Sequence, residues 1–348
     1  MGFGGCTGGE NISPLRPSDG NGVCVVTKEA PLATHHASMT VQPGSRTLAA
    51  PRTAWRGEVQ LRFQRRGHHT CHQGGAKAPL KLQRSSHQAS GHCLLPLLHT
   101  AGGLVGGDAL VVEAQLGAGS QALLTSVAAQ KVYGSVGRFR SQPQGRWSRQ
   151  QLTFKLAAGS DLEWLPQDLV LFSGALYEQE ARAELNPGAS FLTAEVVRLG
   201  RTAAGECLDA GRWRSCLEIV RLDPSGQRRW ELVDRLELGG ANLGDAHGLA
   251  HQPVFGSLAW ASPEPLKPEV MEGLLAACRE DRAGLEGEMA CGALDQGLVA
   301  RYRGSSSQAA RFWFTRIWVR IRMARNLPPP EIPRVWPFQE HPLTAPLP

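Results

Sequence analysis

Apolar and polar residues alternate along most of the chain between residues 55 and 260. The first clear case is "WRGEVQLRFQRRG" (55–67), in which Val59, Leu61 and Phe63 are separated by single polar residues. A period of two places these three side chains on one face of an extended backbone. The segment therefore predicts a half-buried β-strand.

A short motif recurs three times within the alternating region. It has the form Leu-x-x-Gly-Ser/Ala, and alternating residues lead into it while apolar residues follow it, which predicts strand–turn–strand units. The copies are "QLGAGSQALLTS" (115–126), "KLAAGSDLEWLP" (155–166) and "ELNPGASFLTAE" (184–195), with leucines at Leu116, Leu156 and Leu185. Because the spacings of 40 and 29 residues are too irregular for a strict solenoid, the region predicts an all-β body of antiparallel or coiled β layers.

The last part of the alternating region and the residues after it predict a hairpin and a helix. The hairpin is "CLEIVRLDPSGQRRWELVDRLELGG" (216–240), with a turn at Asp223-Pro224-Ser225-Gly226. The helix is "PLKPEVMEGLLAACRED" (265–281), which begins after a proline. Its apolar stripe consists of Val270, Leu274, Leu275 and Cys278.

A strand, "GLVARYRG" (297–304), and a second helix, "SSSQAARFWFTRIWVRIRMARNLPPP" (305–330), complete the predicted elements. The helix opens with serines that can cap it and ends at prolines. Phe314, Ile317, Trp318 and Ile321 form its apolar face, and Arg311, Arg316, Arg320 and Arg325 lie beside that face. A basic amphipathic helix can lie on a membrane, but more often its aromatic residues pack into the protein's own core or a partner.

Composition adds limits to this picture. The chain has 348 residues, is 42% hydrophobic and carries a formal charge of +6. The positive residues form no block, so the charge fits acidic protein partners as well as nucleic acid, and we expect no nucleic-acid role. Residues 1–50, rich in Gly, Ser, Pro and Thr, predict a disordered or non-homologous extension. The eight cysteines include no C-x-x-C pair, and no signal peptide precedes them, which predicts reduced thiols and a cytoplasmic protein.

The segment "HTAGGLVGGD" (99–108) places Gly102, Gly103, Gly106 and Gly107 before Asp108. A phosphate-binding P-loop would need Lys and Ser or Thr after its last glycine, whereas a carboxylate there would repel phosphate. The segment instead predicts a turn that needs positive φ or close backbone packing as the chain enters a strand. Asp108 is first a turn-capping residue and second a possible ligand.

Two groups of side chains could bind metals or protons. "HHTCH" (68–72) contains His68, His69, Cys71 and His72, donors that suit zinc or nickel, and it is expected in a hairpin loop after the first strand. A second ligand group at fixed separation is missing. The carboxylates Glu163 and Asp168 in "EWLPQDLVLF" have no His, Lys or nucleophile tied to them by sequence, so they predict no acid–base site. The residues therefore favour a binding or scaffold protein over an enzyme.

Several segments of the chain resemble one protein family, the urease accessory protein UreD, called UreH in some organisms. The resemblance runs from about residue 55 to 339. It rests on "APLKLQR" (78–84), "LPLLHTAGGLVGGDALVVEAQLGAGSQALLTSVAAQKVYGS" (95–135), "LEWLPQDLVLFSGA" (162–175), "GRTAAGE" (200–206) and "PRVWPFQ" (333–339). The most specific part is the Gly-Gly-x-x-Gly-Gly-Asp segment followed by "TSVAAQKVY". "HHTCH" belongs to none of these segments.

The resemblance implies a mostly β fold, a layered, helical-like β-sheet superhelix with two or so C-terminal α-helices. A single UreD-like β domain would cover residues 51–340, and residues 341–348 would form a flexible tail. It also implies a non-catalytic scaffold that binds apo-urease, recruits UreF and, through UreF, the GTPase UreG, and works without a membrane. Nickel would be in transit, with no tightly bound cofactor.

The family is thought to conduct nickel through an internal passage, for which weakly binding carboxylates are suited. On that basis the candidate passage residues are Asp108, Glu163, Asp168, Glu180 and Glu195, although each is more often a surface or turn carboxylate. The four glycines would form a structural turn. The alternative is a stand-alone nickel- or zinc-storage protein that uses "HHTCH".

Overall fold

The structure is a computed structural model that describes residues 54–223, 225–336 and 341–343. All of them belong to one unit, residues 52–348, which is separate from residues 1–51. The expected extension at residues 1–50 and most of the expected tail at 341–348 lie outside the described residues. Within the described part, no helix is long and apolar enough to cross a membrane.

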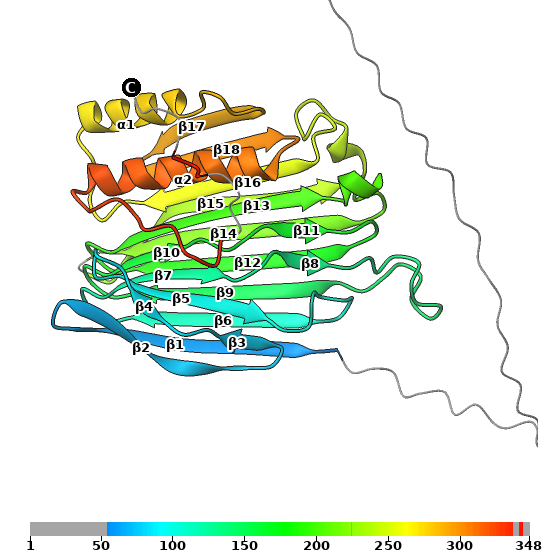
Figure 1. Cartoon of the computed structure of the whole chain (residues 1–348), viewed down its shortest axis with the longest axis horizontal. Coiled ribbons are helices and arrows are strands. Elements are labelled where there is room, and N and C mark those ends of the chain that lie inside the picture. The colour runs from blue at the N-terminus through cyan, green and yellow to red at the C-terminus, as the bar shows by residue number, and fades with distance from the viewer. Residues whose placement is uncertain (1–53, 224, 337–340, 344–348) are drawn as a thin grey trace, which may run out of the picture. The chain divides into compact units, whose positions relative to one another are not determined.

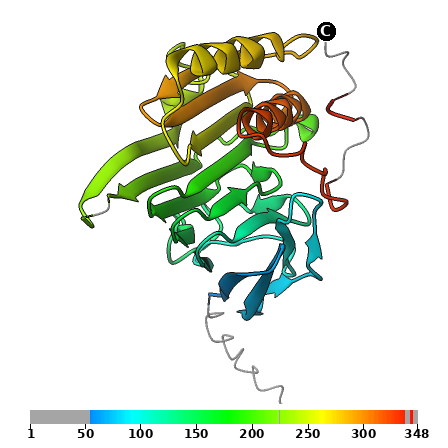
Figure 2. The same ribbon diagram turned by 90° about the vertical axis from the view of Figure 1, so that its left-hand side faces the viewer.

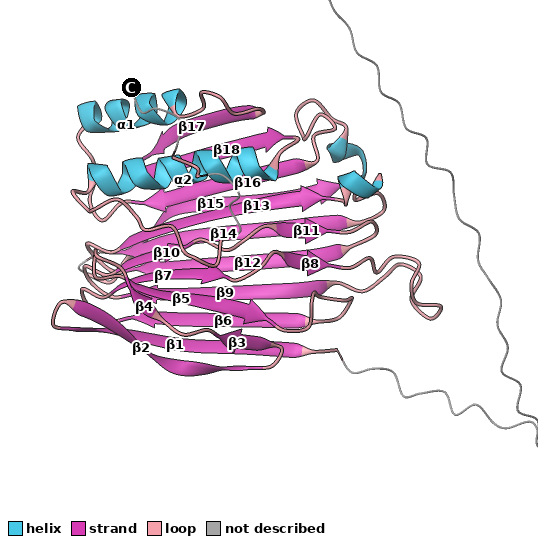
Figure 3. Ribbon diagram, in the orientation of Figure 1, coloured by secondary structure: helices cyan, strands magenta, loops and turns pink. Residues whose placement is uncertain are grey.

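Two β-sheets make up most of the unit (Figures 1 and 3). Sheet A has the order β15 (Arg228–Gly239), β14 (Arg212–Leu222), β12 (Leu176–Leu185), β9 (Ser148–Leu156), β6 (Ala109–Leu116), β1 (Arg56–Arg66) and β2 (His69–Lys77). Sheet B has the order β17 (Glu288–Leu294), β18 (Gly297–Gly304), β16 (Val254–Ala261), β13 (Ser190–Leu199), β10 (Asp161–Trp164), β7 (Gln121–Ser126), β5 (Cys93–His99) and β3 (Leu80–Leu82). The short strands β4 (Ser86–His87), β8 (Gln130–Val132) and β11 (Leu169–Leu171) also pair within sheet B.

The predicted strand–turn–strand units carry the chain from one sheet to the other. Each turn joins a strand of sheet A to one of sheet B: β6 to β7, β9 to β10 and β12 to β13. Successive copies stack in parallel, so that Leu116 pairs with Leu156 and Leu156 with Leu185. The turn glycines Gly119 and Gly159 both have φ of +64°, a conformation that a side chain disfavours. Of the two alternatives left open by the sequence, coiled layers describe this central region.

The ends of the sheets are antiparallel. β1 pairs with β2, β14 pairs with β15, and β16, β18 and β17 pair in succession. The predicted hairpin at 216–240 is confirmed, and Asp223 Oδ1 accepts hydrogen bonds from the backbone N–H groups of Ser225 and Gln227, both at 2.8 Å. The β14–β15 hairpin extends beyond the other strands in Figure 2.

Hydrophobic residues fill two layers. The first lies between the two sheets and includes Phe63, Phe154 and Phe191 as well as the stacked leucines of the repeated turns. The second lies between sheet B and the helices and includes Trp260, Trp313 and Trp318. The alternation predicted for residues 55–67 is confirmed, because Val59, Leu61 and Phe63 are buried in the first layer.

Two α-helices cover sheet B (Figure 2), which confirms the predicted mostly β fold with C-terminal helices. They are α1 (Pro268–Glu280) and α2 (Ser307–Ala324), and the Ser306 hydroxyl caps α2 by accepting from Ala309 N. Short 3-10 helices lie at Thr202–Ala204 and Gly240–Leu243. Including Val270 in the apolar stripe of α1 was wrong: it lies in the first turn and is 43% exposed, whereas burial begins at Leu274.

Candidate functional site

The glycine-rich segment at 99–108 is a tight turn that leads into β6. Gly102, Gly103 and Gly107 have φ of +75°, +153° and +103°. Gly106 has no positive φ, but a Cβ there would overlap the Ser135 hydroxyl and lie 2.8 Å from the carbonyl oxygen of Arg146. Glycine is therefore required for conformation at three positions and for close approach at the fourth.

Both carboxylate oxygens of Asp108 bind backbone N–H groups. Oδ1 accepts from Trp55 N and Oδ2 from Val105 N, each at 2.9 Å, and the residue is buried. The side chain thus holds the turn against the residue that precedes β1. This geometry is that of a capping carboxylate, whose oxygens are already occupied.

The expectation that the "HHTCH" residues lie in a hairpin loop was wrong. Only His68 is in the turn after β1, while His69, Cys71 and His72 belong to β2. Within β2, His69 and Cys71 share one face of the strand and His72 points to the other, so these donors do not all converge on one point. His69 lies beside the ring of His87, with centroids 4.9 Å apart, whereas the Nδ1 of His72 is 3.9 Å from the Sγ of buried Cys93.

Glu163 is buried in an ion pair with α2. Its Oε2 lies 2.5 Å from the Nη2 of Arg322, and its Oε1 accepts from Arg322 Nε at 2.8 Å and from Trp318 Nε1 at 2.7 Å. The Glu163 and Arg322 side chains are 1% and 0% exposed. A charge this deeply buried requires its partner, so Glu163 fastens α2 to sheet B.

Asp161, on the same strand as Glu163, forms a second buried contact. Its Oδ2 lies 3.1 Å from His92 Nε2 and 2.8 Å from Arg325 Nη1. Burial opposes ionisation, but Arg325 and His92 hold the pKa of Asp161 below its usual range. Among the described residues, His92, Asp161 and Glu163 are the one group of three or more metal-ligand residues whose ligand atoms lie within 4.8 Å of one another. Because two guanidinium groups already balance the carboxylates, the group does not suit a divalent cation.

The next two candidate carboxylates lie apart from each other. Asp168 accepts from Arg311 of α2, whose Nε is 2.9 Å away. Glu180 lies on β12 with its side chain exposed. The arginines that the sequence placed beside the apolar face of α2 are thus partly used within the fold, since Arg320 also pairs with Asp281 at 2.8 Å.

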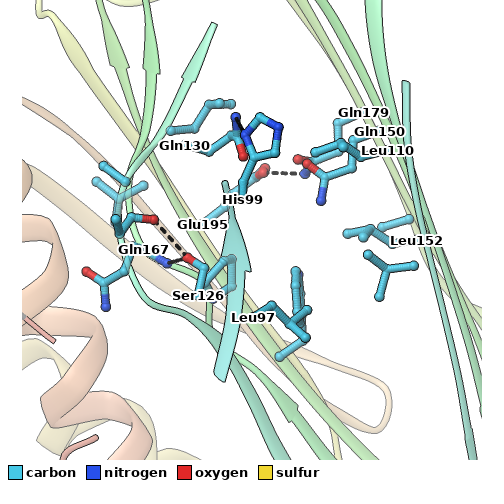
Figure 4. A pocket seen from close by; sticks show the side chains of 18 of the residues that line it. Leu97, His99, Leu110, Ser126, Gln130, Gln150, Leu152, Gln167, Gln179 and Glu195 are labelled. Atoms are coloured by element: carbon cyan, nitrogen blue, oxygen red, sulfur yellow. Dashed lines mark hydrogen bonds between the residues drawn. The ribbon is translucent and has the colours of Figure 1, made fainter. Parts of the chain in front are cut away.

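A cavity of about 410 Å³ lies between sheets A and B (Figure 4). Leu110, Leu152 and Trp164 contribute to its apolar wall. Its polar lining comes from strands of both sheets and from the loop between β10 and β11, and includes His99, Ser126, Gln130, Lys131, Gln150, Gln167, Gln179, Thr193, Glu195, Ser215 and Ser257. The cavity reaches the glycine turn, because Gly102 and Gly103 also line it.

Glu195 is the one candidate carboxylate that lines this cavity. It lies on β13, where Oε2 accepts from Gln179 Nε2 at 2.8 Å and Oε1 from Ser215 Oγ at 3.3 Å. The accessible part of its side chain faces the cavity, and protein atoms surround it. Burial raises the pKa of Glu195 to about 7; the hydrogen bond from Gln179 opposes this rise and the nearby Asp234 adds to it.

His99 is a cavity residue that the sequence analysis did not single out. Its Nδ1 lies 3.2 Å from Gln130 Nε2, whereas its Nε2 is buried without a hydrogen-bond partner among the described residues. Burial lowers the pKa of His99, and Asp108 opposes the shift. A neutral imidazole that can serve as a metal ligand therefore lies beside the cavity. The only sequence signal was its place at the end of a strand, directly before the glycine turn.

Residues 56–337 match the family described as UreD urease accessory protein. The chain belongs to the UreD family. "Urease accessory protein UreD" of Parasynechococcus marenigrum (strain WH8102) is 61% identical over 291 residues, which cover 84% of this chain and 93% of the relative. The protein of that name from Prochlorococcus marinus (strain MIT 9303) is 63% identical over 271 residues, covering 78% and 90%.

Membership in the UreD family makes the chain a urease accessory protein, which fits a non-catalytic role. The matched residues include the glycine turn, the cavity and all five candidate carboxylates. Residues 1–55 precede the match. The match therefore covers the β unit with its two C-terminal helices.

Proposed function

We propose that this chain is a cytoplasmic scaffold of nickel delivery to urease. It binds apo-urease and UreF, recruits UreG through UreF, and conducts nickel through the cavity between its two sheets. The observation that carries the proposal is the position of Glu195, a carboxylate that lines the cavity and accepts hydrogen bonds from neutral groups instead of forming an ion pair with an arginine.

The lining of the cavity suits transit more than storage. Nickel accepts imidazole, carboxylate and amide oxygen ligands, all of which line this cavity at His99, Glu195 and the glutamines. No cysteine is among the lining residues, so the lining lacks the thiolates that bind such metals most tightly. Single weak ligands spaced along a cavity can pass an ion from one to the next.

The other four candidate carboxylates support this choice by contrast. Asp108, Glu163 and Asp168 are occupied by backbone N–H groups or arginines, and Glu180 is exposed on β12. We therefore assign the passage to Glu195 alone among the five, and assign Asp108, Glu163 and Asp168 to holding the fold. The alternating directions of the "HHTCH" side chains disfavour a storage site there.

The test uses tagged full-length chain expressed with UreF, UreG and apo-urease. We expect it to recover all three partners, and we expect Glu195→Gln to recover them equally while the nickel content of urease falls severalfold. Glu180→Gln, which removes an exposed carboxylate, is the matched control and leaves nickel loading unchanged. Recovery of neither UreF nor urease would refute the scaffold. Normal nickel loading with Glu195→Gln would refute the passage.

A further inference from the structure

An ion pair joins the two sheets beside Glu195. Three residues, Glu195, Ser257 and Arg301, lie in register on the adjacent strands β13, β16 and β18. Arg301 donates to the Ser257 hydroxyl and, through Nη2, to Asp234 Oδ2 at 2.6 Å. Asp234 lies on β15 of sheet A, so this contact bridges the sheets next to the polar lining of the cavity. Both side chains of the pair are about one-third exposed, at 32% and 29%.

The ion pair and Glu195 act on each other electrostatically. Asp234 raises the pKa of Glu195, and Arg301 lowers it. The remaining groups in contact with Glu195 are uncharged: the Gln179 amide and the Ser215 hydroxyl. Burial and, to a lesser extent, the negative charge of Glu195 raise the pKa of Tyr177, which therefore stays neutral. The cluster thus holds two carboxylates and one guanidinium.

We propose that Arg301 is a positioning residue that keeps divalent-cation binding at Glu195 weak, so that the ion moves on instead of staying. This inference rests on the proposed passage and adds the device that tunes it. Arg301 acts through charge, since it faces the carboxylates and offers the ion no ligand atom.

Removing the positive charge would convert the end of the cavity into a trap. Without Arg301, Glu195 on sheet B and Asp234 on sheet A would be two carboxylates with no balancing positive charge from this strand. Paired carboxylates are typical ligands of divalent cations, and the low dielectric of the interior strengthens their attraction for an ion. With Arg301 in place, one oxygen of Asp234 is occupied and a positive charge repels the incoming cation.

The experiment measures the affinity of the purified full-length chain for nickel alone, by equilibrium dialysis at pH 7.5. We expect Arg301→Gln to bind nickel about tenfold or more tightly than the wild-type chain, because the substitution removes a positive charge that repels a divalent ion at the neighbouring carboxylates. Arg301→Lys, which keeps the charge, binds like the wild-type chain. Asp234→Asn combined with Arg301→Gln returns the affinity to near the wild-type value, because one carboxylate and one cation are removed together.

A matched control lies two residues along the same strand. Arg303 of β18 pairs with Glu288 of the neighbouring strand β17 and makes no contact with Asp234 or Ser257, so Arg303→Gln should leave nickel affinity unchanged. Thermal unfolding of each variant verifies that the fold is retained. If Arg301→Gln does not fold, Arg301→Met, which also removes the charge, takes its place: tighter nickel binding supports the proposal, and unchanged binding overturns it.

Two outcomes separate this inference from the proposed function. If Arg301→Gln binds nickel no more tightly than the wild-type chain, or if its tighter binding persists after Glu195→Gln is added, the role of Arg301 is refuted, whatever happens to urease. If Glu195→Gln leaves the nickel content of urease unchanged, the passage is refuted, although Arg301→Gln can still tighten binding. Tighter binding together with slower nickel loading of urease supports both.

Discussion

Replacing Glu163 by Gln tests whether this buried carboxylate holds the fold or carries nickel. The substitution keeps the size of the side chain and an oxygen that Trp318 Nε1 can still reach, so it leaves no cavity. It removes only the charge that pairs with Arg322. Arg322 would then be a guanidinium in a fully buried position, with neutral acceptors at Ser90 and Gln88, 3.4 and 3.2 Å away.

The expected loss follows from the burial of the pair. Both side chains are inaccessible to solvent, so Arg322 cannot recover its hydration when its partner is neutralised. Breaking a buried ion pair by removing one partner costs about 3–5 kcal/mol. This is a large fraction of the total stability of a typical domain, which is about 5–15 kcal/mol. We therefore expect Glu163→Gln to loosen α2 and to lower the yield of folded protein.

Urea unfolding, followed by tryptophan fluorescence and circular dichroism, measures the loss, with Arg322→Met added as the second half of a double-mutant cycle. Replacing both members of the pair should cost less than replacing Glu163 alone, since no unpaired charge remains. A loss below about 1 kcal/mol for Glu163→Gln with an unchanged m-value would refute the fastening role. Normal stability with reduced nickel in urease would return Glu163 to the passage.

Four further outcomes are expected. The pKa of Glu195 is raised from about 4.5 to about 7, so the wild-type chain loses stability as pH rises through this window. In denaturation measurements, the free energy of unfolding of Glu195→Gln relative to the wild-type chain should therefore rise by at most about 3 kcal/mol between pH 4.5 and 8. A difference that does not depend on pH contradicts this. Gly106→Val overlaps Ser135 and Arg146 and should cost about 1–3 kcal/mol and lower soluble recovery, and a fully stable variant would show that the turn can relax. Asp108→Ala should lower the free energy of unfolding by about 0.5–2 kcal/mol, as for other lost caps, yet leave the nickel content of urease per folded molecule unchanged. His68→Ala combined with His72→Ala should leave both stability and urease activation nearly intact.

Local patterns predicted the elements well, because each depends on nearby residues. The alternation of Val59, Leu61 and Phe63 and the capped helix after Ser306 are local signals of this kind. The pairing of strands from successive strand–turn–strand units has no such signal. Nothing near Leu116 specifies that its neighbour in the sheet is Leu156 or that the pairing is parallel.

The candidate site was harder to predict for the same reason. Glu163 and Arg322 are 159 positions apart, and a carboxylate in a strand has the same appearance in sequence whether it meets an arginine or a cavity. His99 and Glu195 line one cavity from different strands, β5 and β13, so only the fold brings them together. The glycine turn was readable because positive φ and close approach are properties of the turn itself.

The fastening of α2 has a consequence for how the chain is made. The carboxylates of Asp161 and Glu163 emerge from the ribosome long before Arg322 and Arg325, which come near the end of synthesis. Until those arginines appear, Glu163 has no cationic partner and Asp161 has only His92, so closing sheet B over the two carboxylates is costly. We therefore expect the β unit to consolidate only after translation is nearly finished, and a chain cut short before residue 322 to be degraded by proteases more readily than the full chain.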